Sequence, residues 1–513
     1  MDRTQLAARI QEILKGRPSP ANAPEVHQEP PQLAATLDAP QARAGVHLVA
    51  DEEAAFAARC AADEAGNRVL EVLGATQEHG PGGPCIVVDR HYDGHRRHGR
   101  RPLSEFAAGM ATAAEALDLL LPGWSGTPLF FDLETTGLSG GAGTYAFLVG
   151  FGYFDGDGFH TRQFFLRDFG AERALLHAVT AYVHTFGSRA ATPVAGAQRD
   201  TRDPLPAASC QLPALVTYNG KAFDLPLIDT RYLMHRQASS FNALAHLDLL
   251  FPARRLWRRR LVRQGSDRRV LLAGGLVSQD ADHASCALTV LEEDILGLVR
   301  EDDVPGWEIP ARYFAYARTG DARGLDAVLE HNRLDLVSLG ALTAVVLEMV
   351  TGRTPARDRY ETLALGRLFE FLGRSADAER CYACAAEPEG LFEPALDATA
   401  RAEALRWLAL HRRRARRFAE AAEMWQQLLE IEGLSPELRR EGLEALAIHA
   451  EHRAKDLAAA RRFALGALDL SRGSRHVPEV EHRLGRLHRK ISSRAVTPGA
   501  PPAPIQPSFP VEP

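Results

Sequence analysis

The stretch that decides the fold is LFFDLETTGLSGG, which runs from Leu129 to Gly141. Its opening run of apolar residues is typical of a strand that is buried on both faces in the middle of a sheet. Asp132 and Glu134 stand two residues apart at the end of this run, so their side chains point to the same face of the strand. Two carboxylates held together are costly without a counter-charge, and α/β sheets place their sites at this end of their strands. We therefore expect a central strand that ends at a polar site.

The sequence around this strand alternates strand and helix patterns. TYAFLVGFGYFDGDGFHTRQFFL, over residues 144–166, predicts a hairpin with DGDG as its turn. ALVTYNG, over residues 214–220, predicts another strand, and we expect helices over residues 171–185 and 324–350. Interleaved strands and helices of this kind predict an α/β domain with a mixed central sheet flanked by helices.

The last third of the chain has a different composition, rich in Ala, Arg, Glu and Leu, with no strand pattern. A weak repeat at tetratricopeptide spacing begins at Leu365, with Gly366 and Tyr382 among its marker positions, and two looser copies follow. We therefore expect an all-α domain of tetratricopeptide-like helical repeats. The expected domains are a flexible N-terminal arm (1–44), an ancillary α/β segment (45–120), the α/β domain (121–352), the helical repeats (358–492) and a disordered Pro-rich tail (493–513).

The bulk composition excludes several classes of protein. The chain has 513 residues, of which 45% are hydrophobic and 25% charged, as is ordinary for a globular protein. Its formal net charge of -6 excludes a protein that is basic overall, so contacts with nucleic acid must come from local patches. Six Cys fit a reducing compartment, the N-terminus lacks the apolar core of a signal peptide, and no apolar window is long enough to span a membrane. We expect a cytoplasmic protein that does not enter a membrane.

Two further segments add chemistry to the pair of carboxylates. YNGKAFD, over residues 218–224, places Asn219 and Asp224 at a strand-to-helix junction. HNRLD places His331 and Asp335 one helical turn apart, on the same face of a helix. Carboxylate oxygens are the ligands that Mg²⁺ and Mn²⁺ prefer, and an imidazole can accept a proton near neutral pH. The three segments together predict a divalent-metal site with a proton acceptor beside it.

In this order, FDLETTG, YNGKAFD and HNRLD resemble the three motifs of the DEDD superfamily of 3′→5′ exonucleases. Adjoining stretches such as HLDLLFPARRLWRRRL, together with the C-terminal repeats, are similar to the bacterial YprB-like family. The resemblance covers residues 80–350 and, more loosely, the repeats. It implies a ribonuclease H-like fold and hydrolysis of the phosphodiester bonds of nucleic acid, with DNA favoured over RNA, in DNA repair and alongside a helicase.

The resemblance also implies a role for each motif residue. Two ions, Mg²⁺ or Mn²⁺, would clamp the attacking and leaving oxygens of a phosphodiester. Asp132 would bridge both ions. Glu134 and Asp335 would complete one ion site, and Asp224 would hold the second ion. The superfamily's general-base His normally lies five residues before the last Asp, with a Tyr four before it; here His331 lies four before Asp335 and is the expected base at the Tyr-like position.

Residues next to the motifs are candidates for contact with the substrate. The run FPARRLWRRRLVRQ, over residues 251–264, carries Arg side chains that could bind phosphate and a Trp that could stack on a base, although a solvated helix face is the common alternative. Asp248, in HLDLL, is the main rival for the fourth acid. The candidate substrate-binding residues are Thr135, Gly137, Leu138, Asn219, Lys221, Phe223, Arg254, Arg255 and Trp257.

Two other clusters have plainer interpretations. HYDGHRRHGRR, over residues 91–101, predicts a solvated loop, with phosphate contact as the sharper alternative. CYAC, over residues 381–384, predicts packing between helices, because no second Cys pair accompanies it to complete a metal site.

The leading hypothesis is a metal-dependent nuclease that releases nucleotides from 3′ ends. An RNA-processing exonuclease is one alternative. A nucleic-acid-binding scaffold that has lost catalysis and acts through its helical repeats is another, although the intact set of acids argues against it. In each case the concave surface of the repeats predicts a protein partner.

Overall fold

The computed structural model describes residues 68–112, 114–122, 124, 127–137, 143–190, 212–258, 286–388, 398–471 and 477–495. Its first part is built on a mixed sheet of seven strands in the order β1-β2-β7-β6-β5-β8-β9. The strands are β1 (Thr76–Gly80), β2 (Gly83–Tyr92), β5 (Pro128–Thr135), β6 (Ala146–Asp155), β7 (Gly158–Phe165), β8 (Ala214–Thr217) and β9 (Ala245–Asp248). Neighbouring strands are antiparallel from β1 to β5, whereas β5, β8 and β9 run parallel. The predicted mixed sheet and the β6–β7 hairpin are therefore confirmed.

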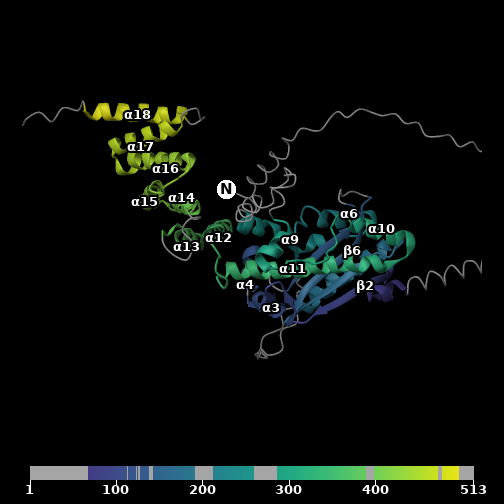
Figure 1. The fold of residues 1–513 in the computed structure, drawn as a ribbon. Helices are drawn as coiled ribbons and strands as arrows, with labels where there is room; N and C mark the ends of the chain where they lie inside the picture. Colours follow the sequence, from purple (N-terminus) through teal and green to yellow (C-terminus); the bar gives the residue numbers. More distant parts are fainter. Residues whose placement is uncertain are drawn as a thin grey trace, which may run out of the picture. The chain divides into compact units, whose positions relative to one another are not determined.

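Helices cover both faces of the sheet. On one face α11 packs against β5, β6 and β7, with α3 beside it (Figure 1). The opposite face lies against α5, α6 and α10. The helices of this part are α3 (Leu103–Thr112), α4 (Ala114–Leu120), α5 (Glu172–Ala190), α6 (Asp224–Met234), α9 (Leu288–Leu291), α10 (Ile309–Thr319) and α11 (Asp326–Val350).

The apolar run of β5 is divided between two cores. Phe130 belongs to the core formed with α11, and Phe131, on the other face of the strand, belongs to the core formed with α5, α6 and α10. Both rings are fully buried. β5 is thus a central strand, as its continuous apolar sequence predicts.

The helix predicted over residues 324–350 is present as α11, but it is buried more completely than a helix with a single apolar face would be. Every residue of α11 from Leu336 to Val350 is buried, because α3, α4 and α9 pack around it in addition to the sheet. Gly340 allows the close approach of helix and sheet, since a Cβ there would lie 2.8 Å from the ring of Phe159. The second half of α11 is therefore a core helix, and only its first turns reach the sheet edge.

The cluster at residues 91–101 is a turn with many exposed side chains, as predicted, but two of its side chains have structural roles. It contains a small two-stranded sheet, β3 (Arg97–His98) and β4 (Arg101–Pro102). His98 is buried and its Nε2 lies 2.8 Å from the hydroxyl of Ser338 in α11. Arg101 donates to both oxygens of Glu348, at 2.8 and 2.9 Å. These two side chains tie the segment to α11, so the phosphate-contact alternative does not hold for them.

The described residues from Arg359 onward form helices, each of which packs against the next along the chain. Gly366 in α12 lies so close to α13 that a Cβ there would come within 2.7 Å of the ring of Tyr382. Cys381 and Cys384 are free thiols within α13, in keeping with the predicted packing role. These helices are α12 (Arg359–Phe371), α13 (Ser375–Ala386), α14 (Ala398–Arg414), α15 (Phe418–Leu429), α16 (Pro436–His449), α17 (Leu457–Leu470) and α18 (Val477–Ala495).

Some expectations concern residues outside those that the structure describes, including the N-terminal arm (1–44) and the predicted tail from residue 496 onward. The first three residues of the predicted tail, 493–495, belong instead to α18. Among the described residues, no helix combines the length and apolar character needed to cross a membrane.

Candidate active site

The two carboxylates that follow the apolar run lie toward the C-terminal end of the central strand β5. We call this end of the sheet, as distinct from its outermost strands, the carboxylate edge. Asp132 pairs with Gly150 of β6, and the β5–β6 register shifts between Glu134 and Thr135. A shift of this kind bends a strand and redirects the side chains beside it. Asp132 and Glu134 keep some contact with solvent, although both are closely surrounded by protein atoms. The predicted polar end of the central strand is therefore present.

Asp132 is held by the first half of α11. The side-chain amide of Asn332 donates to Asp132 Oδ2 at 2.7 Å, and the amide oxygen of Asn332 accepts from Gln163 of β7 at 2.8 Å. Asn332 is fully buried and lies directly over Gly150, where a Cβ would approach its Oδ1 to 2.2 Å. Only glycine at position 150 leaves room for this contact, so β6 and β7 jointly determine how Asn332 orients the acid.

Asp224 reaches the same edge from the first turn of α6. The preceding turn is organised by Asp248 at the end of β9, whose carboxylate accepts the backbone N–H groups of Asn219 and Lys221 at 2.8 and 3.1 Å. Asn219 has a positive φ of 64°, which Asn tolerates better than most residues. Asp248 is buried and also accepts the N–H of Leu250. It therefore acts as a brace for the turn, which argues against its role as the fourth metal ligand.

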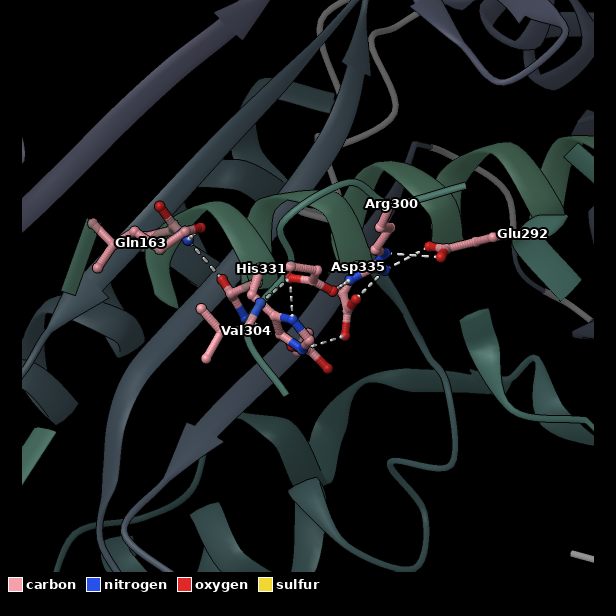
Figure 2. Close-up of polar contacts among 10 residues, drawn as sticks. Gln163, Glu292, Arg300, Val304, His331 and Asp335 are labelled. Atoms are coloured by element: carbon pink, nitrogen blue, oxygen red, sulfur yellow. Dashed lines mark hydrogen bonds and ion pairs between the residues drawn. The ribbon is translucent and has the colours of Figure 1, made fainter. Parts of the chain in front are cut away.

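His331 and Asp335 lie on one face of α11, as their spacing predicts. Both side chains have partners in the loop before α10 (Figure 2). His331 Nδ1 lies 2.8 Å from Asp303 Oδ1, and Asp335 forms an ion pair with Arg300. Arg300 also donates to both oxygens of Glu292, with Nε 2.8 Å from Oε2.

Asp132, Glu134 and Asp224 lie close enough to other carboxylates, Asp335 among them, for these charges to affect their ionisation. Burial and the charges of Asp335, Glu134 and Asp224 raise the pKa of Asp132 well above its ordinary value. Burial and the charges of Asp335, Asp224 and Asp303 raise the pKa of Glu134 in the same way, against the opposing charge of Arg300. For Asp224, burial and the charges of Asp248 and Asp335 raise the pKa to about 7. Like charges thus gather at this edge without full compensation.

The donor chemistry of this edge fits a hard divalent cation. Asp132, Glu134, Asp224 and Asp335 offer carboxylate oxygens, and a cation among them would relieve the repulsion between these negative charges. Within the described residues, no group of three or more His, Cys, Asp or Glu side chains is already arranged around a common metal position. Arg300 supplies a positive charge at Asp335 in this arrangement.

The candidate substrate-binding residues near the motifs lie at the same edge. Thr135 follows Glu134, and its hydroxyl donates to the carbonyl of Gly137 at 2.9 Å. Lys221 and Phe223 are exposed on the turn before α6, where the Phe223 side chain is 60% exposed. Leu138 lies outside the described residues.

The prediction that Trp257 stacks on a base is wrong. Its ring is fully buried and its Nε1–H donates to Glu361 of α12 at 2.7 Å. Arg255 is exposed, but its guanidinium lies over the ring of Phe371, 3.9 Å from the centroid. Arg254 is exposed on the same helical turn. Residues 253, 256 and 257 are apolar at the spacing of one helical face, which indicates burial. This pattern is a better guide to Trp257 than the Arg residues beside it.

Three side chains of the site escaped the sequence reasoning. Arg300 and Asp303 lie on an acidic loop without a recognisable motif. Their partners on α11 follow them by 35 and 28 residues, so no local spacing connects them. Asn332 lies within the HNRLD motif, next to His331, and its amide contact with Asp132 depends on how α11 packs on the sheet.

Comparison with known proteins agrees with this geometry. Residues 129–347 match the family model of the RNase H superfamily. The chain is also similar to the "Uncharacterized protein YprB" of Bacillus subtilis (strain 168), with 27% identity over 419 residues, which cover 80% of this chain and 87% of that protein. The matched segment begins at the first apolar residue of the LFFDLE run and ends within α11, so it contains all four acids. The match and the mixed sheet together support an RNase H-like domain.

Proposed function

We propose that the protein is a metal-dependent nuclease that removes nucleotides from the 3′ end of nucleic acid, with DNA as the favoured substrate. The observation that carries the proposal is the gathering of four carboxylates from β5, α6 and α11 at one sheet edge, where burial and the neighbouring negative charges raise the pKa values of Asp132, Glu134 and Asp224. The RNase H-like domain suggests activity of the nuclease type. The 3′→5′ direction, the preference for DNA and a role in repair beside a helicase rest on the resemblance to DEDD exonucleases.

In this proposal Asp132, Glu134, Asp224 and Asp335 hold two Mg²⁺ or Mn²⁺ ions. When bound, such ions would polarise the phosphodiester and neutralise charge that develops on its oxygens. His331 takes a proton from the attacking water.

The residues around these acids prepare the site and meet the substrate. Asn332 keeps Asp132 in its orientation through the 2.7 Å hydrogen bond. Lys221 and Phe223, exposed on the turn before α6, would contact a phosphate and a base. Asn219, Thr135 and Gly137 border the same edge. The chain thus offers acids, a proton acceptor and substrate contacts within one region.

The test is a cleavage assay with the full-length protein. DNA and RNA, each single- and double-stranded and labelled at either the 3′ or the 5′ end, are incubated with Mg²⁺ or Mn²⁺. We expect stepwise shortening from the 3′ end of DNA and complete loss of cleavage when a chelator is added.

The other outcomes of this assay decide between the alternatives. Cleavage of RNA in preference to DNA would support the RNA-processing exonuclease. Binding of nucleic acid without cleavage, under every metal condition, would contradict the enzyme and support the scaffold. Internal cuts would retain a nuclease but refute the exonuclease.

We also propose that the helices after residue 358 form tetratricopeptide-like repeats that bind a protein partner. The close contact of Gly366 with Tyr382, and the packing of each helix on the next, support this. Deletion of residues 398–492, which keeps α12 and its contact with Trp257, should abolish partner binding and leave the acids of the α/β part intact. An unchanged set of partners would contradict the proposal.

A further inference from the structure

The loop before α10 contains an acid whose contacts point to a role at the site. Asp303 lies on this loop, and its side chain is 18% exposed. Its Oδ1 accepts a hydrogen bond from the backbone of Val304 at 2.9 Å and lies 2.8 Å from His331 Nδ1. Its Oδ2 accepts from Arg300 at 2.9 Å. Both oxygens of Asp303 therefore accept hydrogen bonds, and Oδ1 also lies within hydrogen-bond distance of the expected general base.

The Asp303 carboxylate is itself held in place by a buried ion pair. The Arg300 side chain is 5% exposed and that of Glu292 is 1% exposed, and the two are joined by two hydrogen bonds. Arg300 thus presents a fixed donor to Asp303 while it also pairs with Asp335 (Figure 2). Because two hydrogen bonds to Glu292 already fix the Arg300 guanidinium, Arg300 holds the Asp303 carboxylate in one orientation.

An ionised carboxylate only accepts hydrogen bonds. Burial alone would raise the pKa of Asp303, but hydrogen bonds and charges from His331 and Arg300 outweigh it and lower that pKa. A carboxylate at Nδ1 therefore selects the His331 tautomer with its proton on Nδ1. In that tautomer the lone pair is on Nε2.

Nε2 of His331 faces the acids of the site. It lies 3.8 Å from Asp335 Oδ2, which is too far for a hydrogen bond. We propose that Asp303 is a positioning residue that orients the His331 ring and fixes its tautomer, so that Nε2 is the atom that accepts a proton at the carboxylate edge. This inference rests on the proposed nuclease function for its catalytic meaning, whereas the ring geometry stands apart from it. The contact with Asp303 also explains how a His four residues before Asp335 can act as the general base. The loop before α10, rather than the spacing along the helix, sets the orientation of the ring.

The first test reads the ring directly. Full-length protein labelled with ¹⁵N-histidine is compared with Asp303→Ala, and His331→Ala identifies the signal. We expect the Nδ1–H tautomer in the unaltered protein and a shift toward the Nε2–H tautomer in Asp303→Ala. The same tautomer in both proteins would overturn the proposal, whether or not the protein cleaves nucleic acid.

The second test is a double-mutant cycle on single-turnover cleavage. Asp303→Ala should lower the maximal single-turnover rate by about 10- to 100-fold, the range seen when a group that orients a metal-bound His is removed, with little change in the substrate concentration that gives half of that rate. In the His331→Ala background, removal of Asp303 should cost nothing more, because the residue acts through the ring. Glu301→Ala, which removes an exposed carboxylate from the same loop, is the matched control and should retain full activity.

The outcomes separate the two proposals. Additive losses from Asp303→Ala and His331→Ala would show that Asp303 acts by another route. A change in the half-saturating substrate concentration alone would make it a substrate contact instead. If the unaltered protein cleaves no substrate, the nuclease proposal fails, and the tautomer measurement still decides whether Asp303 positions the ring. If Asp303→Ala unfolds the protein, Asp303→Leu, which keeps a similar shape but has no hydrogen-bond acceptor, replaces it in both tests.

Discussion

Two buried groups of charges in this protein differ in how their acids are compensated. At the end of β5, carboxylates surround one another and burial raises the pKa values of Asp132 and Glu134. In the C-terminal helices, Glu451 is fully buried but receives hydrogen bonds from Arg486 and Lys490 of α18, at 2.7 to 2.8 Å. The hydrogen bond from Arg486 leads the effects that lower the pKa of Glu451 to about 2, against its burial.

The difference separates a site from a structural contact. Glu451 joins the segment after α16 to α18, and its charge is already balanced by the protein itself. The acids at β5 are placed by separate elements and lack such balance, so the protein bears a cost that a cation or a reacting group can relieve. Acids should therefore affect activity in the first group and stability in the second.

The largest expected effect is on Asp132. Asp132→Asn keeps an oxygen that can accept from Asn332 but removes a charge from the cluster. Cleavage should fall by at least about 10³-fold, since transition-state stabilisation by a charged site is lost. The melting temperature should stay equal or rise, because repulsion decreases. A marked loss of stability would show that Asp132 is a structural acid like Glu451.

The next largest expected effect is a loss of stability at acid pH, caused by the buried imidazole of His98. Burial, and then the charges of Arg300 and Arg96, lower the pKa of His98 from 6.5 to about 4. The unfolded chain therefore binds the proton more readily, and stability present above pH 6.5 is lost as the pH falls toward 4. The loss should reach roughly 3 kcal/mol.

His98→Gln removes this titration and can still bond the hydroxyl of Ser338. The free energy of unfolding, measured in denaturant between pH 7 and pH 4.5, should fall less steeply for this variant than for the unaltered protein. Equal slopes would show that His98 is not buried in its neutral form.

A smaller effect is expected at Glu451. Glu451→Gln removes the acceptor charge shared by Arg486 and Lys490, and each lost charged hydrogen bond is worth a few kcal/mol at most. We expect a loss of about 2 kcal/mol in the free energy of unfolding, since the cations remain partly solvated, with no change in cleavage rate. Reduced cleavage at unchanged stability would show that Glu451 contributes to activity rather than to stability.

The smallest effect is the control for both groups. Asp321 pairs with Arg323 on the exposed surface. Asp321→Asn should leave both cleavage and the melting temperature unchanged, because exposed ion pairs contribute little. A measurable loss of either would mean that charge removal alone, apart from burial, explains the other variants.

Local patterns in the sequence predicted a large part of the fold. Strand β5, the β6–β7 hairpin and the helix from 326 to 350 were recognised from apolar periodicity and turn residues, whose effects act over a few neighbouring residues. Asp132, Glu134, Asp224, His331 and Asp335 are predicted as site residues from recognisable junctions and spacings and from the resemblance of the three motifs, and the four acids do lie near one another. Trp257 was misassigned because an Arg-rich stretch resembled an exposed face, whereas burial depends on what packs against it from α12.

What the sequence determined by itself is the set of acids and the kinds of element that carry them. Which of these acids meet, and what holds them, was decided only by tertiary structure. Asp248 and Asp224 are both acids near a strand or helix end, yet Asp248 serves backbone N–H groups while Asp224 faces the cluster. Asp303 reaches His331 from 28 residues away along the chain. Contacts between distant segments depend on how the sheet and α11 pack, and no local pattern carries that information.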